Sequence, residues 1–276
     1  MENLKTVDIS INNVIDISPL YSCKSLEAID ISANPIPKNQ IEKFSKKILV
    51  HAFNLGNQEP NINCEFQKEI NKRRINYLIH FTPTINLYSI LEQGKIMSRA
   101  KLEGLDIEQF DVLDYAQFTD TVRYDDKNYI NLSISSPNTF LFSKFRERTK
   151  NDITINWCVL KIDPKHIYEK GTKFSVTNAA SNAAKAIGIT GDLEKFKMLF
   201  ADRINIPHGV RGRIKSEFPT NIQAEVLVKN NIPVDSIIEV CFESQESLAA
   251  AKAALYEFDT SKFVVDKEIF SPNRSL

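Results

Sequence analysis

Residues 77–94, YLIHFTPTINLYSILEQG, form the stretch from which the fold can be argued. Apolar and polar residues alternate over 77–81, which predicts a β-strand. The apolar residues at 87, 90 and 91 have helical spacing, and Gly94 ends that helix. His80 therefore lies on the strand, Thr82 directly after it and Asn86 at the start of the helix. A strand histidine among apolar residues is by itself more often a core group than a catalytic one.

Strands and helices alternate irregularly along the rest of the chain. The same patterns predict strands at 129–135, 155–162, 174–176, 224–228 and 237–242, and helices at 65–74, 141–149, 181–187, 193–203 and 247–258. Because no regular strand–helix–strand rhythm is present, we expect an α+β fold with a mixed or split sheet rather than a doubly wound one.

Two charged residues, Glu225 and Arg123, have ordinary structural interpretations. Glu225 lies at the mouth of the strand in QAEVLV (223–228), where a buried carboxylate is costly without a partner or a function, and where an exposed strand end is the alternative. Arg123, in TVRYDD (121–126), is ordinarily a surface charge paired with the neighbouring aspartates.

Four motifs, taken together and in order, resemble the DarT family of bacterial toxins. They are HFT followed by NL and IL (80–91), Arg123 ahead of INLSISSPN (130–138), TNAAS (177–181) and QAEVLV (223–228). The resemblance covers about residues 77–245. It implies an ADP-ribosyltransferase fold, a split β-sheet that holds NAD+ without a glycine-rich phosphate loop. It also implies transfer of ADP-ribose from NAD+ onto bases of single-stranded DNA.

The resemblance assigns roles to individual residues. By similarity, His80, Thr82 and Asn86 bind the nicotinamide and ribose end of NAD+, Arg123 faces its phosphates and the reacting ribose, and Glu225 is the catalytic acid. A carboxylate stabilises the oxocarbenium-like ribose that forms when the glycosidic bond breaks. A guanidinium matches the diphosphate in a fixed fork geometry that lysine does not reproduce.

Two more positions follow from the same resemblance. Asn178 falls where the family carries a polar residue near the incoming base. Phe142 is placed where an aromatic ring could stack on nicotinamide, and the alternative is a core residue of the helix that follows.

The acceptor side is predicted from basic residues. The loop 204–222, just before the Glu225 strand, contains His208, and Arg211, Arg213 and Lys215 recur at every second position. In an extended loop these three side chains project to one side and can follow a phosphate backbone. A second basic cluster is formed by Lys144, Arg146, Arg148 and Lys150 against Glu147.

Composition excludes several classes of protein. Thirty-five basic residues balance thirty-five acidic ones, so no global charge attracts nucleic acid or membrane. The eight glycines form neither G-x-G-x-x-G nor a Walker loop, which excludes a Rossmann fingerprint and a Walker phosphate loop. No C-x-x-C or zincin spacing occurs, so we expect no metal. NAD+ as co-substrate is what the family resemblance implies. With no signal-like start and no long apolar run, we expect a cytoplasmic protein that does not enter a membrane.

The N-terminal segment repeats itself. Leu4, Val7, Ile9, Asn12 and Val14 recur 22 residues later as Leu26, Ile29, Ile31, Asn34 and Ile36, the spacing of a leucine-rich repeat. We expect this segment and a linker over 1–64, with a short amphipathic helix at 40–49, and the transferase domain over 65–276. The repeats are either a stabilising cap or a partner-binding element.

The sequence therefore predicts an NAD-dependent ADP-ribosyltransferase toxin that modifies a base in single-stranded DNA, in a toxin–antitoxin or phage-defence system. Two alternatives stay open: RNA as the acceptor, and a catalytically inactive interaction module that uses the repeats. The family resemblance implies a macrodomain-type antitoxin that removes the mark.

Overall fold

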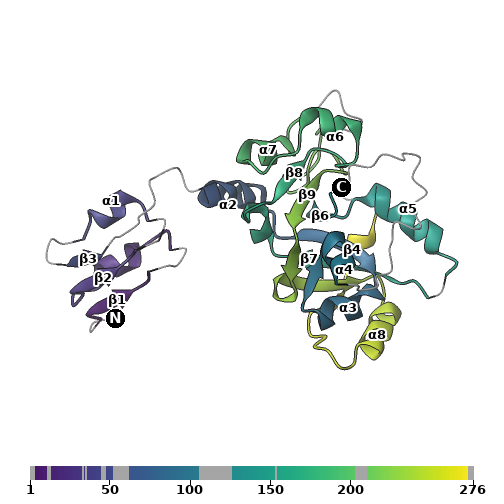
Figure 1. Cartoon of the computed structure of the whole chain (residues 1–276), viewed down its shortest axis with the longest axis horizontal. Helices are drawn as coiled ribbons and strands as arrows, with labels where there is room; N and C mark the ends of the chain where they lie inside the picture. The colour runs from purple at the N-terminus through teal and green to yellow at the C-terminus, as the bar shows by residue number, and fades with distance from the viewer. Residues whose placement is uncertain are drawn as a thin grey trace. The chain divides into compact units, whose positions relative to one another are not determined.

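The computed structural model describes residues 4–10, 14–32, 34, 36–44, 48–51, 62–105, 126–152, 154–202 and 210–272. The chain divides into two compact units, Met1–Glu65 and Phe66–Leu276. Both units are drawn in Figure 1.

The first unit is a small parallel sheet with the order β1 (Thr6–Asp8), β2 (Ala28–Asp30) and β3 (Leu49–His51). Each β1 residue pairs with the residue 22 positions later, and each β2 residue with the residue 21 positions later. A 3-10 helix (Ser18–Ser22) and α1 (Lys38–Ile41) lie in the connections. The strands and connections enclose a core of isoleucines, namely Ile17, Ile29, Ile31 and Ile36.

Asn34 ties successive turns of this unit together. Its amide donates to the carbonyl of Ile9 at 2.6 Å, and its Oδ1 accepts from the backbone of Val14 at 3.0 Å. A buried asparagine therefore satisfies backbone groups that lie 20 and 25 residues away.

The expectation of a helix over 40–49 is wrong. Helix α1 ends at Ile41, and Leu49 starts β3, where its N–H donates to the carbonyl of Glu27 at 2.9 Å. The apolar residues of this stretch, Phe44, Ile48 and Val50, pack on the isoleucine core from a turn and a strand. Pairing with the neighbouring strand overrides the local helical pattern.

The second unit is built on a seven-stranded mixed sheet with the order β12-β11-β7-β4-β6-β9-β8. The strands are β4 (Leu78–Pro83), β6 (Tyr129–Ile134), β7 (Trp157–Ile162), β8 (Lys173–Ser175), β9 (Glu225–Lys229), β11 (Ile237–Phe242) and β12 (Phe263–Val265). Strands β11 and β12 are parallel, and the other neighbours are antiparallel. A separate pair is formed by β5 (Lys95–Met97) and β10 (Asn231–Pro233).

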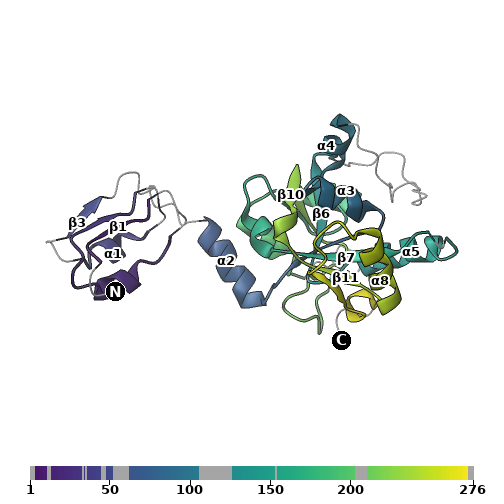
Figure 2. The ribbon, with the colours of Figure 1, turned by 90° about the horizontal axis from the view of Figure 1, so that it is seen from below.

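Helices surround this sheet. They are α2 (Ile62–Arg73), α3 (Asn86–Glu92), α4 (Arg99–Gly104), α5 (Thr139–Thr149), α6 (Asn182–Ile187), α7 (Leu193–Met198) and α8 (Gln245–Ala254), with 3-10 helices at Pro164–Tyr168, Val234–Ser236 and Glu268–Phe270. Helix α7 lies beside β8 (Figure 1). Helix α8 contacts β11 and β12. Figure 2 shows α8 beside β11.

Alternation along the strands separates two hydrophobic clusters. Leu78, Leu132 and Val226 belong to the larger cluster, on one face of the sheet. Ile79 belongs to the second cluster, with Phe142 of α5. Because successive side chains of a strand point to opposite faces, α5 covers the face that carries Ile79.

The expected strands of this unit are present to within a few residues, and so are most of the helices. Helix α7 is shorter than the expected 193–203, because bonds from Leu199 N–H to Phe196 and from Phe200 N–H to Lys197 tighten the chain into a turn. The sequence patterns missed the short elements β5, β10, β12 and α4. Three-residue strands carry too little alternation to be recognised.

Candidate active site

The sheet divides between β4 and β6. The two strands pair at Leu78↔Ile134 and Ile79↔Ser133, where the register between them ends. Beyond that point β4 continues to pair with β7 as far as Pro83, and β6 pairs with β9. The strands thus part at His80, the first residue of β4 past the shared register.

His80 spans this division with its side chain. Its Nδ1 lies 3.3 Å from the carbonyl oxygen of Asn131 on β6. Burial lowers the pKa of His80 below its ordinary value, and the hydrogen bond to Asn131 partly opposes this effect. Because a carbonyl only accepts, the neutral ring carries its proton on Nδ1, and Nε2 can accept a hydrogen bond from a ligand.

Thr82 and Asn86 form a buried polar pair next to His80. The Asn86 amide, at the first residue of α3, donates to the Thr82 hydroxyl at 3.0 Å, and both side chains are buried. His80 and Thr82 are two residues apart on one strand, so they share a face. The structure therefore groups the three residues that the sequence predicts for the nicotinamide and ribose end of NAD+.

Glu225 is the first residue of β9 and is 7% exposed. Its Oε2 accepts a hydrogen bond from the backbone N–H of Ala179 at 2.8 Å. It pairs with Ser175 on β8, and the β6–β9 register, continued by one residue, places it opposite Ser133. A short bond from a backbone N–H to a carboxylate fixes the direction of the carboxylate.

Ile79, Ser133, Glu225 and Ser175 form one row across the sheet, which we call the Glu225 row. Residues directly opposite each other in antiparallel strands share a face, so Glu225 lies on the face covered by α5. His80, next to Ile79, points to the other face. A ligand that contacts both His80 and Glu225 must therefore pass between the parted strands.

Asn178 lies beside this carboxylate. Its Oδ1 accepts from the N–H of Ala180 at 3.0 Å, and its carbonyl accepts from Ser181 at 2.9 Å. This tight turn presents the N–H of Ala179, between them, to Glu225. Sequence reasoning missed Ala179, because a backbone donor leaves no side-chain signal. It also missed Ser133, whose only signal is a hydroxyl in an otherwise apolar strand.

Phe142 is a core residue. It is 2% exposed and stacks on Phe81 with ring centroids 4.6 Å apart. Trp157 and Phe270 lie 5.6 and 5.7 Å from the same ring. Its faces are occupied by protein, so of the two interpretations the burial favours the core residue over a ring stacked on nicotinamide.

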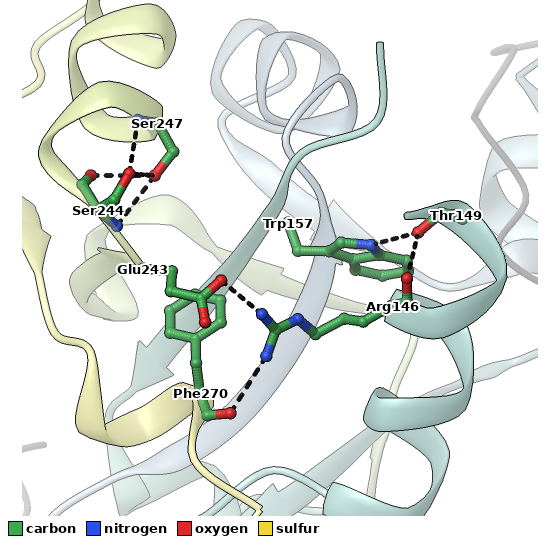
Figure 3. A network of polar contacts seen from close by, with 7 residues as sticks. All are labelled: Arg146, Thr149, Trp157, Glu243, Ser244, Ser247 and Phe270. Carbon is green, nitrogen blue, oxygen red and sulfur yellow. Dashed lines mark hydrogen bonds and ion pairs between the residues drawn. The ribbon is translucent and has the colours of Figure 1, made fainter. Parts of the chain in front are cut away.

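The basic cluster on α5 is partly engaged in structural contacts, as Figure 3 shows. Arg146 pairs with Glu243 and donates to the carbonyl of Phe270 at 3.2 Å. Lys150 pairs with Glu147, and Lys144 lies 4.0 Å above the ring of Phe140. Several cations of the cluster therefore have partners within the protein.

The expected row of Arg211, Arg213 and Lys215 is also wrong. Residues 211–218 of the loop make two tight turns, in which the Ile214 N–H donates to the carbonyl of Arg211 and the Phe218 N–H to that of Lys215, so this stretch is not extended. The Arg211 guanidinium folds back and donates to the carbonyls of Lys215 at 2.6 Å and Phe218 at 3.0 Å. Arg213 and Lys215 are exposed. Arg123 and His208 lie outside the described residues.

Metal ligands and membrane-spanning helices were considered over the residues that the structure describes. No group of three or more His, Cys, Asp and Glu side chains there could hold a metal ion. None of the described helices has the length and apolar character that crossing a membrane requires.

The profile of the DarT family, described as ssDNA thymidine ADP-ribosyltransferase, matches residues 79–271. A search of curated proteins finds no match. Among solved structures, Thermus sp. 2.9 DarT in complex with carba-NAD+ matches with a TM-score of 0.51 and 16% identity, over 71% of this chain and 98% of that chain. The same enzyme in complex with ADP-ribosylated ssDNA matches with a TM-score of 0.48 and 15% identity, over 72% and 97% of the two chains.

Thermosipho africanus DarTG in complex with ADP-ribose matches with a TM-score of 0.46 and 18% identity, over 71% of this chain and 51% of that chain. The Thermus DarT complex with carba-NAD+ supports the fold, and the family profile covers well over half of the chain. The chain belongs to the DarT family of ssDNA thymidine ADP-ribosyltransferases.

Proposed function

We propose that this chain transfers ADP-ribose from NAD+ to thymidine in single-stranded DNA. The divided sheet is the observation that supports this proposal. His80, Thr82 and Asn86 lie on one side of the division, and the buried Glu225 lies on the other. The nicotinamide and ribose end of NAD+ lies across the division and contacts both sides.

The reaction needs little covalent participation from the protein. The bond between ribose C1″ and the nicotinamide nitrogen breaks, and its electron pair neutralises the leaving nicotinamide. Because N1 of thymidine already carries deoxyribose, N3 is the ring nitrogen that can react. N3 forms the new bond to C1″, and its proton passes to solvent water. The Glu225 carboxylate, directed by Ala179, stabilises the positive charge that develops on the ribose.

The β4 side orients the substrate. The neutral His80 presents Nε2 as an acceptor for a ribose hydroxyl or the nicotinamide amide. The Thr82–Asn86 pair supplies a second, buried polar contact. Arg123, assigned by family resemblance, binds the phosphates, and Asn178 lies on the side where the base arrives.

Three finer proposals concern context. The protein acts as a cytoplasmic toxin of a toxin–antitoxin or phage-defence system, and a macrodomain-type antitoxin removes the mark, as the family resemblance implies. The first unit is a short leucine-rich-repeat-like element. Its parallel strands at 22- and 21-residue spacing and the bonds of Asn34 support this proposal.

Mass spectrometry of oligonucleotides after incubation with NAD+ tests the function. We expect ADP-ribose on thymidine of single-stranded DNA, and none after Glu225→Ala. The fold check is thermal melting of the variant. Modification of RNA but not of DNA would contradict the proposal that single-stranded DNA is the acceptor. Absence of transfer together with absence of NAD+ turnover would contradict the enzyme and favour an interaction module.

A further inference from the structure

A small pocket lies at the end of the second unit's sheet, where β4 begins and β6 ends. It has a volume of about 200 Å³ and is lined by Arg74, Asn76, Tyr77, Ser135, Glu217 and Phe218. Pockets for drug-sized ligands measure about 300–1,000 Å³. This pocket therefore suits a single ring system rather than a whole dinucleotide such as NAD+.

The pocket lies next to the Glu225 row. The N–H of Ser135 donates to the carbonyl of Tyr77 at 3.2 Å, which continues the pairing of Ile79 with Ser133. Tyr77 is two residues before Ile79, so its side chain lies on the same face, about 7 Å along the strand. The pocket thus borders the row and the face that carry the candidate catalytic carboxylate.

Among the residues that the structure describes, Ser135 contributes a hydroxyl without a hydrogen-bond partner to the pocket. Its backbone is in the left-handed region with φ of 58°, which is uncommon for a residue other than glycine. The side chain is 8% exposed, and within the described part of the chain its buried Oγ has no hydrogen-bond partner. Strained backbone and unsatisfied polar atoms in native proteins concentrate at functional sites.

The walls of the pocket are held in place. Helix α2 ends at Arg73, and Arg74, with φ of 60°, turns the chain toward Asn76 and Tyr77. On the opposite wall, the Ser216 hydroxyl donates to the carbonyl of Arg73 at 3.2 Å. The Arg211 guanidinium holds the carbonyl of Phe218 at 3.0 Å. The pocket is therefore formed before any ligand arrives.

We propose that this pocket binds the acceptor base, an inference that rests on the proposed function. The rings of Tyr77 and Phe218 provide faces on which a base can stack. Arg74 and Asn76 donate hydrogen bonds, and Glu217 accepts them. The two carbonyl oxygens of thymine can accept from these donors. N3 lies between them and forms the new bond to ribose C1″, so it faces NAD+ rather than the pocket wall.

The test measures binding and does not depend on catalysis. In the full-length chain carrying Glu225→Gln, the affinity for an oligonucleotide with one thymidine is compared with that for the same oligonucleotide with an abasic site, by fluorescence anisotropy with a non-hydrolysable NAD analogue present. We expect a preference for the thymidine. Stacking of about 1–3 kcal/mol per base predicts that Phe218→Ala reduces this preference by about 5- to 150-fold.

Asn76→Ala provides a second variant, because Asn76 is exposed and its loss should not disturb folding. It should also reduce the preference and leave the affinity for the NAD analogue unchanged. Tyr256→Ala is the matched control, since Tyr256 is an aromatic side chain that is 83% exposed and outside the pocket. A thymidine preference that survives the combined Asn76→Ala and Phe218→Ala changes would overturn the proposal. Failure of the proposed function would give a different result, because the unmodified chain would then transfer no ADP-ribose.

Discussion

The two sides of the divided sheet hold their polar groups in different ways. On the β4 side, side chains bond within one short stretch, with Asn86 donating to Thr82 four residues earlier. On the β9 side, Glu225 is directed by the backbone of Ala179, 46 residues away, and lies opposite Ser133 of a third segment. The first arrangement is local, and the second exists only once three segments have come together.

We propose that the difference corresponds to two tasks. A local, buried side-chain pair is suited to binding NAD+ in its ground state. A carboxylate fixed by a backbone donor is suited to charge that appears only in the transition state, because it needs no reorganisation when that charge develops. Changes on the two sides should therefore affect different kinetic parameters.

The largest expected effect is at Glu225. Glu225→Gln keeps an oxygen that can accept from Ala179 and removes the charge. We expect the rate of transfer at saturating NAD+ and oligonucleotide to fall by about 10²- to 10³-fold or more, the size seen when one electrostatic contact to a transition state is lost. Single-turnover kinetics measures it.

Glu239→Gln is the matched control for that variant. Glu239 is a carboxylate on β11, separated from β9 by β7, β4 and β6 in the sheet, and it pairs with Lys161 rather than with the site. It should leave the transfer rate within about threefold. Equal losses in both variants would show that the Glu225 effect is not specific to the site.

The next effect is at the Thr82–Asn86 pair. Thr82→Val removes the acceptor of a buried amide, so the free energy of unfolding should fall by about 1–3 kcal/mol, and the KM for NAD+ should rise. A double-mutant cycle with Asn86→Ala, followed by urea denaturation, checks the coupling. Strictly additive losses of unfolding free energy in the double mutant would contradict an interaction between Thr82 and Asn86.

Local sequence patterns predicted much of the fold and the candidate residues on both sides of the divided sheet. They did not predict how strand pairing brings those residues together. Alternation identified the strands that carry His80 and Glu225, and the cost of burying a carboxylate singled out Glu225. The register that brings Glu225 opposite Ser133 is non-local, so no pattern within one segment contains it. The loop prediction failed because spacing at every second residue implies one side only in an extended chain, and here two turns fold Arg211 back.

Arg211 and Arg213 offer a smaller contrast. Arg211→Ala removes charge-assisted bonds to two carbonyls and should lower the free energy of unfolding by about 1–3 kcal/mol. Arg213→Ala, at an exposed position, should change it by less than about 0.5 kcal/mol. Urea denaturation of both variants decides. An Arg211→Ala protein as stable as the unmodified chain would return Arg211 to the phosphate-binding role.

The smallest effect concerns the pH dependence of His80. Burial lowers its pKa in the folded state, so the unfolded chain binds more protons between the lowered value and about 6.5. The stability should be fully present above about pH 6.5 and decrease as the pH falls through this window. His80→Gln, which keeps a donor for Asn131, should show a shallower decrease in unfolding free energy. Identical pH profiles would contradict the neutral, buried ring.

We propose that the β4 side binds NAD+ in its ground state and that the β9 side acts on the transition state. Calorimetric binding of a non-hydrolysable NAD analogue to Thr82→Val and Glu225→Gln, beside their transfer rates at saturating NAD+, tests it most directly. We predict that Thr82→Val weakens binding by about tenfold with little loss of rate at saturation, and that Glu225→Gln binds nearly as the unmodified chain does and loses the rate. Equal loss of affinity in both variants, with rates that recover at saturating NAD+, would contradict the claim.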